Sequence, residues 1–182
     1  GKLLIMTVLC AIAFGANTAY SVVAPILPNT VKSYSLTDIF TAIIISGYPL
    51  GMILFTPYFG KMLNTIGQKK TLLIGVVSMG ISMLVFGFLD RFPKDDSGKW
   101  LFFGIAVVMR VLMGFGNGCV NSATSSIIAF NYPESMGFLI GLQQIFNNAG
   151  MLIGTLLGGV LLGLGGFYVP FLVNAVVLLA LA

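Results

Sequence analysis

Six long apolar stretches, separated by short polar segments, constrain the fold of this chain more than any other feature. A helix needs about 20 apolar residues to cross the hydrocarbon core of a bilayer. Charged residues mark the breaks and predict spans at about residues 3–27, 37–59, 72–89, 100–130, 136–164 and 167–182. We therefore expect an all-α, integral, multi-pass membrane protein in which residues 1–182 form a single six-span bundle.

The composition agrees with this class and argues against others. Hydrophobic residues make up 58% of the chain and charged residues 8%, whereas a soluble domain has about 25% charged residues. The formal net charge is +4, but so few charges leave no basic face of the kind that binds nucleic acid. We expect the lipid bilayer as a partner and no nucleic acid.

No residue pattern indicates a metal, a cofactor or a covalent catalyst. The chain has two cysteines and no histidine, and Cys10 and Cys119 lie in apolar runs, as small buried side chains do. The glycine-rich stretches lack the Lys-Ser/Thr pair of a phosphate-binding loop. We expect no cofactor, no metal site and no enzymatic activity.

Basic residues predict the orientation in the membrane. Lys61, Lys69 and Lys70 lie between the second and third spans with no acid nearby, and such residues concentrate on the cytoplasmic side. We place this loop and Lys2 in the cytoplasm. The loop at Glu134, which falls on the same side, carries no base. On the opposite side, acids and bases balance, with Lys32 facing Asp38, and Asp90, Asp95 and Asp96 facing Arg91, Lys94 and Lys99.

Local signals predict where the first two helices end and begin. Pro25 and Pro28 indicate the end of the first span, because proline removes a helical hydrogen bond. Ser35-Leu36-Thr37-Asp38 has the spacing of a capping box, in which a Ser and an acid three residues later satisfy the first backbone donors.

The loop from Gly60 to Lys70 is the most specific motif. It resembles the loop motif of the major facilitator superfamily, Gly-x-x-x-Asp-Arg-x-Gly-Arg-Lys-x. Gly60, Gly67, Lys69 and Lys70 match this motif, and Asn64 stands where the family has the acid. That acid helps to latch the two halves of the family's fold, so Asn64 argues against the latch. The alternative is a basic loop that only sets topology.

Span four carries the charge that lies deepest in the apolar sequence. Arg110-Val-Leu-Met-Gly114 resembles the family's fourth-span motif, Arg-x-x-Gln-Gly. A buried arginine costs about 3 kcal/mol or more unless it is paired or hydrated, so it marks a functional site by default. Arg110, Gly114, Asn117 and Asn121 recur at helical spacing and share one face. We expect this face to line a wet cavity; the alternative is a structural arginine bonded to carbonyl groups.

Span five carries Gly150-x-x-x-Gly154-Thr155-x-x-Gly158-Gly159. This stretch resembles the family's antiporter motif, Gly-x-x-x-Gly-Pro-x-x-Gly-Gly, with Thr155 in place of the proline. Small residues four apart let helices approach closely, and such packing alone is the alternative reading. Without the proline the expected kink is lost, so the resemblance implies antiport only weakly.

Two further similarities bear on the fold. Segment 51–60 matches segment 150–159 at four of ten positions, which hints at a 3+3 internal repeat, as in many transporters; biased composition explains the match equally well. Segments 21–28, 87–93 and 166–172 resemble the vesicular amine transporters, the last two their polyamine branch. The resemblance covers essentially the whole chain but only the first six of the family's twelve spans.

The chain departs from amine transporters at their membrane acids, which hold the cationic substrate and exchange protons. Ala16 stands where the monoamine branch has Asp, and Gln143 and Gln144 lie in the region where the polyamine branch has Glu. A cation in a low-dielectric cavity needs a counter-charge. Three alternatives remain open. A second half of the protein supplies the counter-charge, the substrate is not a cation, or the chain does not transport.

Deep polar residues are concentrated in spans one, two, four and five, which line the pathway in the superfamily. The alternative for each amide is an interhelical hydrogen bond worth about 0.6–2 kcal/mol, and for each tyrosine simple packing. The candidate cavity residues are Asn17, Tyr20, Tyr48, Arg110, Asn117, Asn121, Gln143, Gln144, Asn147 and Asn148. The candidate conformational residues are Gly60, Asn64, Gly67, Lys69, Lys70, Gly150, Gly154, Gly158 and Gly159.

Three functions follow from these observations. The resemblance implies a proton-coupled, alternating-access transporter of polyamine-like or amine-like small organic solutes, which works with a second six-span half. A degenerate six-span relic that serves as a structural subunit of a larger membrane complex is the second hypothesis. The third is an organic-anion transporter, for which Arg110 would be the matching charge.

Overall fold

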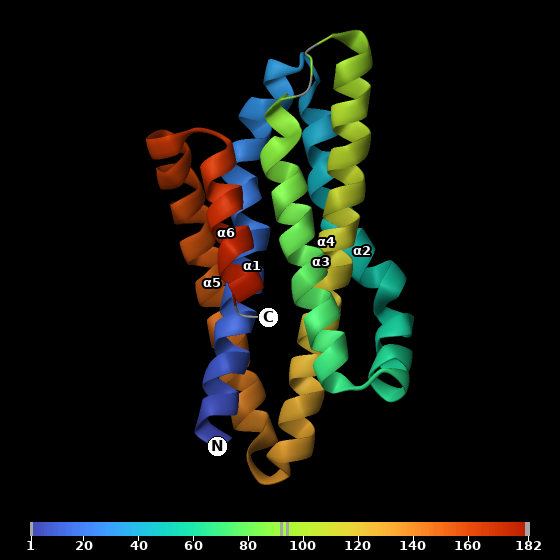
Figure 1. The fold of residues 1–182 in the computed structure, drawn as a ribbon, viewed down its shortest axis with the longest axis vertical. Coiled ribbons are helices and arrows are strands. Elements are labelled where there is room, and N and C mark those ends of the chain that lie inside the picture. Colours follow the sequence, from blue (N-terminus) through green and yellow to red (C-terminus); the bar gives the residue numbers. More distant parts are fainter. Residues whose placement is uncertain (1, 92, 94, 181–182) are drawn as a thin grey trace.

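The computed structural model describes residues 2–91, 93 and 95–180, and in this part of the chain every regular element is a helix. Residues 1 and 181–182, and Phe92 and Lys94 of the expected polar loop, lie outside the described residues. Short 3-10 turns at Leu89–Arg91 and Pro133–Ser135 join helices. The prediction of a six-helix, all-α fold is confirmed. The helices, shown in Figure 1, are α1 Lys2–Ser33, α2 Asp38–Thr65, α3 Gln68–Phe88, α4 Asp96–Asn131, α5 Met136–Gly165 and α6 Tyr168–Ala180.

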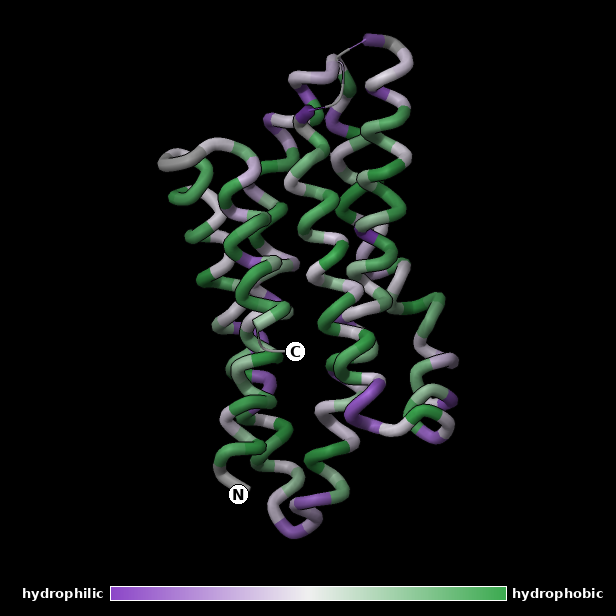
Figure 2. The backbone as a smooth tube through the Cα atoms, viewed as in Figure 1, coloured by the Kyte–Doolittle hydropathy of each residue, from purple (hydrophilic) through white to green (hydrophobic). Residues whose placement is uncertain are grey.

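The outer surface of the bundle is apolar. Apolar residues dominate along the helices, and polar residues gather at the turns between them (Figure 2). Helices α1 to α5 are long and apolar enough to cross a membrane, and α6 is a shorter apolar helix of 13 residues. Ile53, Leu152 and Leu156 are each about 70% exposed. Exposure on this scale is costly in water but is favourable against lipid or another apolar surface.

The helices pack in two matching sets. Helix α1 lies along α5, α4 lies along α2, and α3 contacts both α4 and α6. If α1 is exchanged with α4, α2 with α5 and α3 with α6, the α1–α5 contact becomes the α4–α2 contact, and the α3–α4 contact becomes the α6–α1 contact. The first glycines of the two similar segments share this relation, because Gly51 rests on the Val111 carbonyl of α4 and Gly150 on the Phe14 carbonyl of α1. The packing therefore has the 3+3 pattern that the sequence hinted at.

Two expectations about helix ends are wrong. Helix α1 continues through Pro25 and Pro28 to Ser33. Membrane helices tolerate proline because neighbouring helices, hydroxyl side chains and water satisfy the freed backbone groups. The capping box does not form either: Thr37 is the N-cap of α2 and makes no side-chain capping bond. Ser35 instead has a φ of 56° and donates its backbone N–H to the Lys32 carbonyl at 3.0 Å, so it closes α1.

Helices α2 and α4 approach closely because glycines face carbonyl groups on both sides of the contact. A Cβ atom at Gly114 of α4 would overlap the Tyr48 carbonyl oxygen of α2. A Cβ atom at Gly47 of α2 would lie 3.1 Å from the Cβ of Arg110. The hydrophobic effect does not drive helices together in a membrane, because lipid is as apolar as their side chains. Their association depends instead on such close van der Waals contact. This contact fixes Tyr48 against α4.

We expect Gly114→Ala to weaken the α2–α4 contact, because its methyl group has no space beside Tyr48. Overpacking of this kind costs about 1–3 kcal/mol and would lower the apparent melting temperature by about 5 °C. Size-exclusion chromatography of the heated, detergent-solubilised protein measures this shift. Gly104→Ala is the matched control on the same helix, because nothing lies within 4 Å of the added Cβ. An equal shift in both variants would contradict the prediction.

Candidate functional site

The side chain of Arg110 is buried beside a stacked pair of tyrosine rings. It is 1% exposed, and its guanidinium carbon lies 5.2 Å from the Tyr20 ring centroid and 5.8 Å from that of Tyr48. The two rings stack with their centroids 4.1 Å apart. One terminal nitrogen donates to the Tyr20 carbonyl oxygen at 3.4 Å and contacts the sulfur of Met113 at 3.7 Å. Helices α1, α2 and α4 therefore all contribute to holding this cation.

Arg110 has no carboxylate partner within the part of the chain that the structure describes. The ion pair found there is Lys32 with Asp38, 3.5 Å apart at the surface. Cation–π contacts contribute about 0.5–2 kcal/mol each, against a cost of about 3 kcal/mol for an arginine at the centre of a membrane helix. The aromatic pair thus offsets part of the cost of burying the charge. The Nε atom of Arg110 has no hydrogen-bond partner among the described residues.

A directional chain of amide hydrogen bonds crosses the bundle beside this cation. Asn17 of α1 donates to the Asn147 side-chain oxygen of α5 at 2.8 Å. Asn147 donates to Asn121 of α4 at 3.4 Å, and Asn121 donates to the Asn117 oxygen at 2.7 Å. Asn117 then donates to the hydroxyl group of Tyr48 on α2. The chain returns in this way to the tyrosine pair that holds Arg110.

Nine of the ten predicted cavity residues form this one cluster, which we call the polar network. Gln144 accepts a hydrogen bond from Asn147 and donates one to Asn148, each at 3.4 Å. Gln143 stays outside: it is 3% exposed, and its side-chain oxygen has no partner among the described residues. The polar network consists of Asn17, Tyr20, Tyr48, Arg110, Asn117, Asn121, Gln144, Asn147 and Asn148.

The polar network is buried at one end and accessible at the other. Arg110 and Asn117 are almost fully buried, Asn121 is half-buried, and Gln144 and Asn148 are exposed on α5. The face of α4 that the sequence predicts as a cavity lining is therefore closed by tyrosines near Arg110. It is more accessible at the level of Asn121, which is half-buried.

A second polar seam joins α1 to α5, and sequence reasoning missed most of it. The hydroxyl group of Ser21 lies 3.0 Å from that of Thr155 and also donates to the Met151 carbonyl. The Thr18 hydroxyl contacts the Gly150 carbonyl at 3.1 Å. Thr155 stands where the related motif has proline, and its hydroxyl gives α5 a bond to α1 instead. The three-residue spacing of Thr18 and Ser21 places both hydroxyl groups on one face of the helix, and this spacing could have predicted the contact.

The motif glycines have different roles. Gly150, Gly154 and Gly158 face α1, where a Cβ would press on its backbone, whereas nothing lies within 4 Å of a Cβ at Gly159. Gly67, the N-cap of α3, has a φ of 91°, a conformation that favours glycine. The other residues of this motif lie in helices rather than in a loop, Gly60 and Asn64 in α2 and Lys69 and Lys70 in α3. Nothing lies within 4 Å of a Cβ at Gly60, and the other three side chains are exposed.

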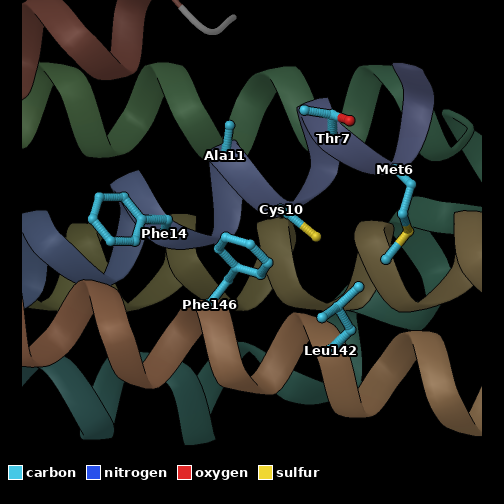
Figure 3. Close-up of a pocket in the computed structure, with 7 residues that line it drawn as sticks. All are labelled: Met6, Thr7, Cys10, Ala11, Phe14, Leu142 and Phe146. Carbon is cyan, nitrogen blue, oxygen red and sulfur yellow. The ribbon is translucent and has the colours of Figure 1, made fainter. Parts of the chain in front are cut away.

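An apolar pocket lies elsewhere, between α1 and α5 (Figure 3). Its volume is about 500 Å³, and its walls include Cys10, Phe14 and Phe146. None of its lining residues belongs to the polar network, and none is charged. Among the described residues, no group of three or more His, Cys, Asp and Glu side chains is placed to hold a metal ion. The polar network is therefore the better candidate for a site that binds a polar solute.

Known proteins resemble this chain along most of its length. The family model for the Major Facilitator Superfamily matches residues 9–182. The chain is 28% identical to MFS-type transporter SLC18B1 of Mus musculus over 87% of this chain and 34% of that protein. It is 26% identical to the probable vesicular acetylcholine transporter-B of Danio rerio, over 97% of this chain and 36% of that protein. Multidrug resistance protein MdtG of Proteus mirabilis is 28% identical over 91% of this chain and 40% of that protein.

The chain spans between about a third and two fifths of the length of these relatives. Together with the apolar helices, the match establishes an integral, multi-pass membrane protein. The family match covers every helix except the first turns of α1. The chain belongs to the major facilitator superfamily.

Proposed function

We propose that the chain forms one half of a transporter for small organic solutes, which works by alternating access against a second six-helix bundle. The polar network carries this proposal. Polar and charged side chains inside a membrane are expensive, and they mark solute or ion pathways. In transporters built from repeats, the solute site lies near the midplane, where the repeats meet.

The accessible end of the polar network would contact the solute. Gln144 and Asn148 are exposed on α5, and Asn121 is half-buried on α4 beside them. Their side chains offer both N–H donors and carbonyl acceptors. Arg110 would organise the site through the tyrosine pair, because its 1% exposure keeps it from direct contact in this conformation. A change in the packing of Tyr20 and Tyr48 would expose it.

An amine or polyamine is the first candidate substrate. Relatives of this chain include proteins named vesicular acetylcholine transporter, from Danio rerio and Torpedo marmorata. Amide oxygens accept hydrogen bonds from ammonium groups, but the five acids of this chain lie in loops or at helix ends. The carboxylate that balances a cationic solute and exchanges the proton would therefore come from the second bundle.

An organic anion is the second candidate, and Arg110 favours it. This guanidinium lacks a carboxylate within the described residues, and its Nε has no partner there. A buried positive charge attracts an anion and repels a cation strongly at low dielectric constant. A carboxylate that displaced one tyrosine ring would pair with Arg110 directly.

Uptake by the full-length protein in proteoliposomes separates these candidates. The assay compares radiolabelled spermidine, acetylcholine and succinate, with and without a pH gradient. Uptake of the amines, driven by the gradient, supports the amine proposal, and uptake of succinate alone supports the anion proposal. A protein that moves no organic solute and co-purifies at fixed stoichiometry with a membrane complex would instead be a structural subunit.

We expect Arg110→Met to lower the initial uptake rate at least about tenfold, because the polar network loses its central charge and both cation–π contacts. Its melting temperature should stay the same or rise, since the buried charge no longer has to be desolvated. Arg110→Lys should also transport poorly, because a compact ammonium group cannot reproduce the planar contact of the guanidinium with the tyrosine pair. Unfolding of the Met variant would instead identify a purely structural arginine.

Cysteine labelling tests which side of α5 faces the pathway. Ile153 is the matched control for Gln144, since it is also exposed and lies about two and a half turns further along, on the opposite side of the helix. In a background with Cys10 and Cys119 replaced by Ala, Gln144→Cys should react with a charged, membrane-impermeant thiol reagent, and the transported solute should slow the reaction. Ile153→Cys should not react. Equal labelling at both positions would contradict the placement of the pathway.

A further inference from the structure

The two ends of the bundle differ in charge. By sequence, the end that holds the start of α1 and the α2–α3 and α4–α5 turns carries Lys2, Lys61, Lys69 and Lys70 against Glu134. These segments lie at the lower end in Figure 1. At the opposite end, residues 32–38 and 90–99 carry four bases and four acids. The basic end therefore has a net positive charge beside the membrane surface, while the other end is neutral.

The excess charge is concentrated on one surface around the α2–α3 turn. We define the lysine surface as Lys61, Lys69, Lys70, Ile66 and Phe130. All five side chains are exposed, and Phe130 is 80% exposed. None of the three lysines forms an ion pair with another described residue. No acid occupies the first turn of α3, where Lys69 and Lys70 lie, so the helix dipole adds to their positive potential.

The lysine surface contains a hollow that is lined by both basic and apolar side chains. A pocket of about 510 Å³ is lined by Leu63, Ile66 and Phe130 together with Lys69 and Lys70. A second pocket of about 420 Å³, on the other side of Ile66, is lined by Lys61 and the aromatic rings of α2 and α4. A soluble anion would use the lysines but would leave the apolar walls in water. A phospholipid uses both, because its headgroup is anionic and its glycerol and acyl carbons are apolar.

The position of this surface in the bilayer agrees with a lipid as its ligand. Helices α2 and α3 are both candidate membrane spans, and the turn between them joins their ends, so the lysines lie where the headgroups are. The positive-inside rule places this turn on the cytoplasmic side. The cytoplasmic leaflet carries the anionic lipids, and each nearby lysine contributes about fivefold to binding them.

We propose that the lysine surface is a binding site for an anionic phospholipid headgroup of the cytoplasmic leaflet. The phosphate and carboxylate oxygens of the headgroup lie against Lys69 and Lys70, and Lys61 adds to the field from the end of α2. The upper acyl carbons pack on Ile66, Leu63 and Phe130. Asn64, which replaces the acid of the related loop motif, leaves these lysines without a competing negative charge in their own loop. The site does not depend on the proposed transport function.

Native mass spectrometry of the full-length protein, released from nanodiscs, tests this proposal. The nanodiscs contain phosphatidylcholine with 20% phosphatidylserine, and the readout is the amount of phosphatidylserine that stays bound. Lys69→Gln/Lys70→Gln should lower the affinity about thirtyfold, the product of two lysine contributions. The matched control is Lys32→Gln/Lys99→Gln, which removes the same charge from the opposite end and should keep wild-type retention.

Four further measurements decide between the possible ligands. Lys69→Arg/Lys70→Arg keeps the charge and should retain the lipid. Size-exclusion chromatography of the Gln and Arg variants shows whether either one is misfolded, so a loss of lipid that comes from misfolding is recognised. Phe130→Ser should weaken retention of the lipid without changing any charge. Equal retention of phosphatidylcholine and phosphatidylserine would overturn the proposal. So would displacement of the lipid by millimolar inorganic phosphate, which would identify a site for soluble anions.

Discussion

The burial of one guanidinium group without a carboxylate is the constraint around which the polar network is arranged. Arg110 lies against two stacked aromatic rings and bonds to a carbonyl group, and these come from Tyr20 on α1 and Tyr48 on α2. Both rings lie close to α4, so three helices meet at this group. The amide chain that starts at the Tyr48 hydroxyl and ends at Asn17 then includes α5 in the same arrangement.

The close approach of the helices follows from small residues at the contacts. Gly51 and Gly114 let α2 lie against the backbone of α4, and Gly150 and Gly154 do the same between α5 and α1. These two contacts are equivalent under the 3+3 repeat, so one packing solution is used twice. The difference between them is chemical: the α4 contact holds the charged group, and the α1–α5 contact holds the Ser21–Thr155 hydroxyl pair. A symmetric scaffold thus carries an asymmetric polar site.

Features that extend along whole helices were predictable from sequence, whereas the ends of individual helices were not. The apolar runs were long enough to predict six helices, and the deep polar residues of the first, second, fourth and fifth spans predicted nine residues that the structure brings together. Gln143 shows the limit of that reasoning, because helical spacing alone did not separate it from Gln144. The capping box failed because Ser35 serves the end of α1, and α1 passes through Pro25. Such outcomes depend on neighbouring helices, which a single segment does not encode.

The most direct measurement of the central claim is a cryo-electron microscopy map of the full-length protein with a saturating concentration of a transported solute. We expect density for the solute between the two bundles, within hydrogen-bond distance of Asn121, Gln144 or Asn148 and adjacent to the tyrosine pair. Density in the apolar pocket beside Phe14 and Phe146 would contradict this. So would a second bundle whose apolar side chains pack directly on Gln144 and Asn148 and leave no room for a solute.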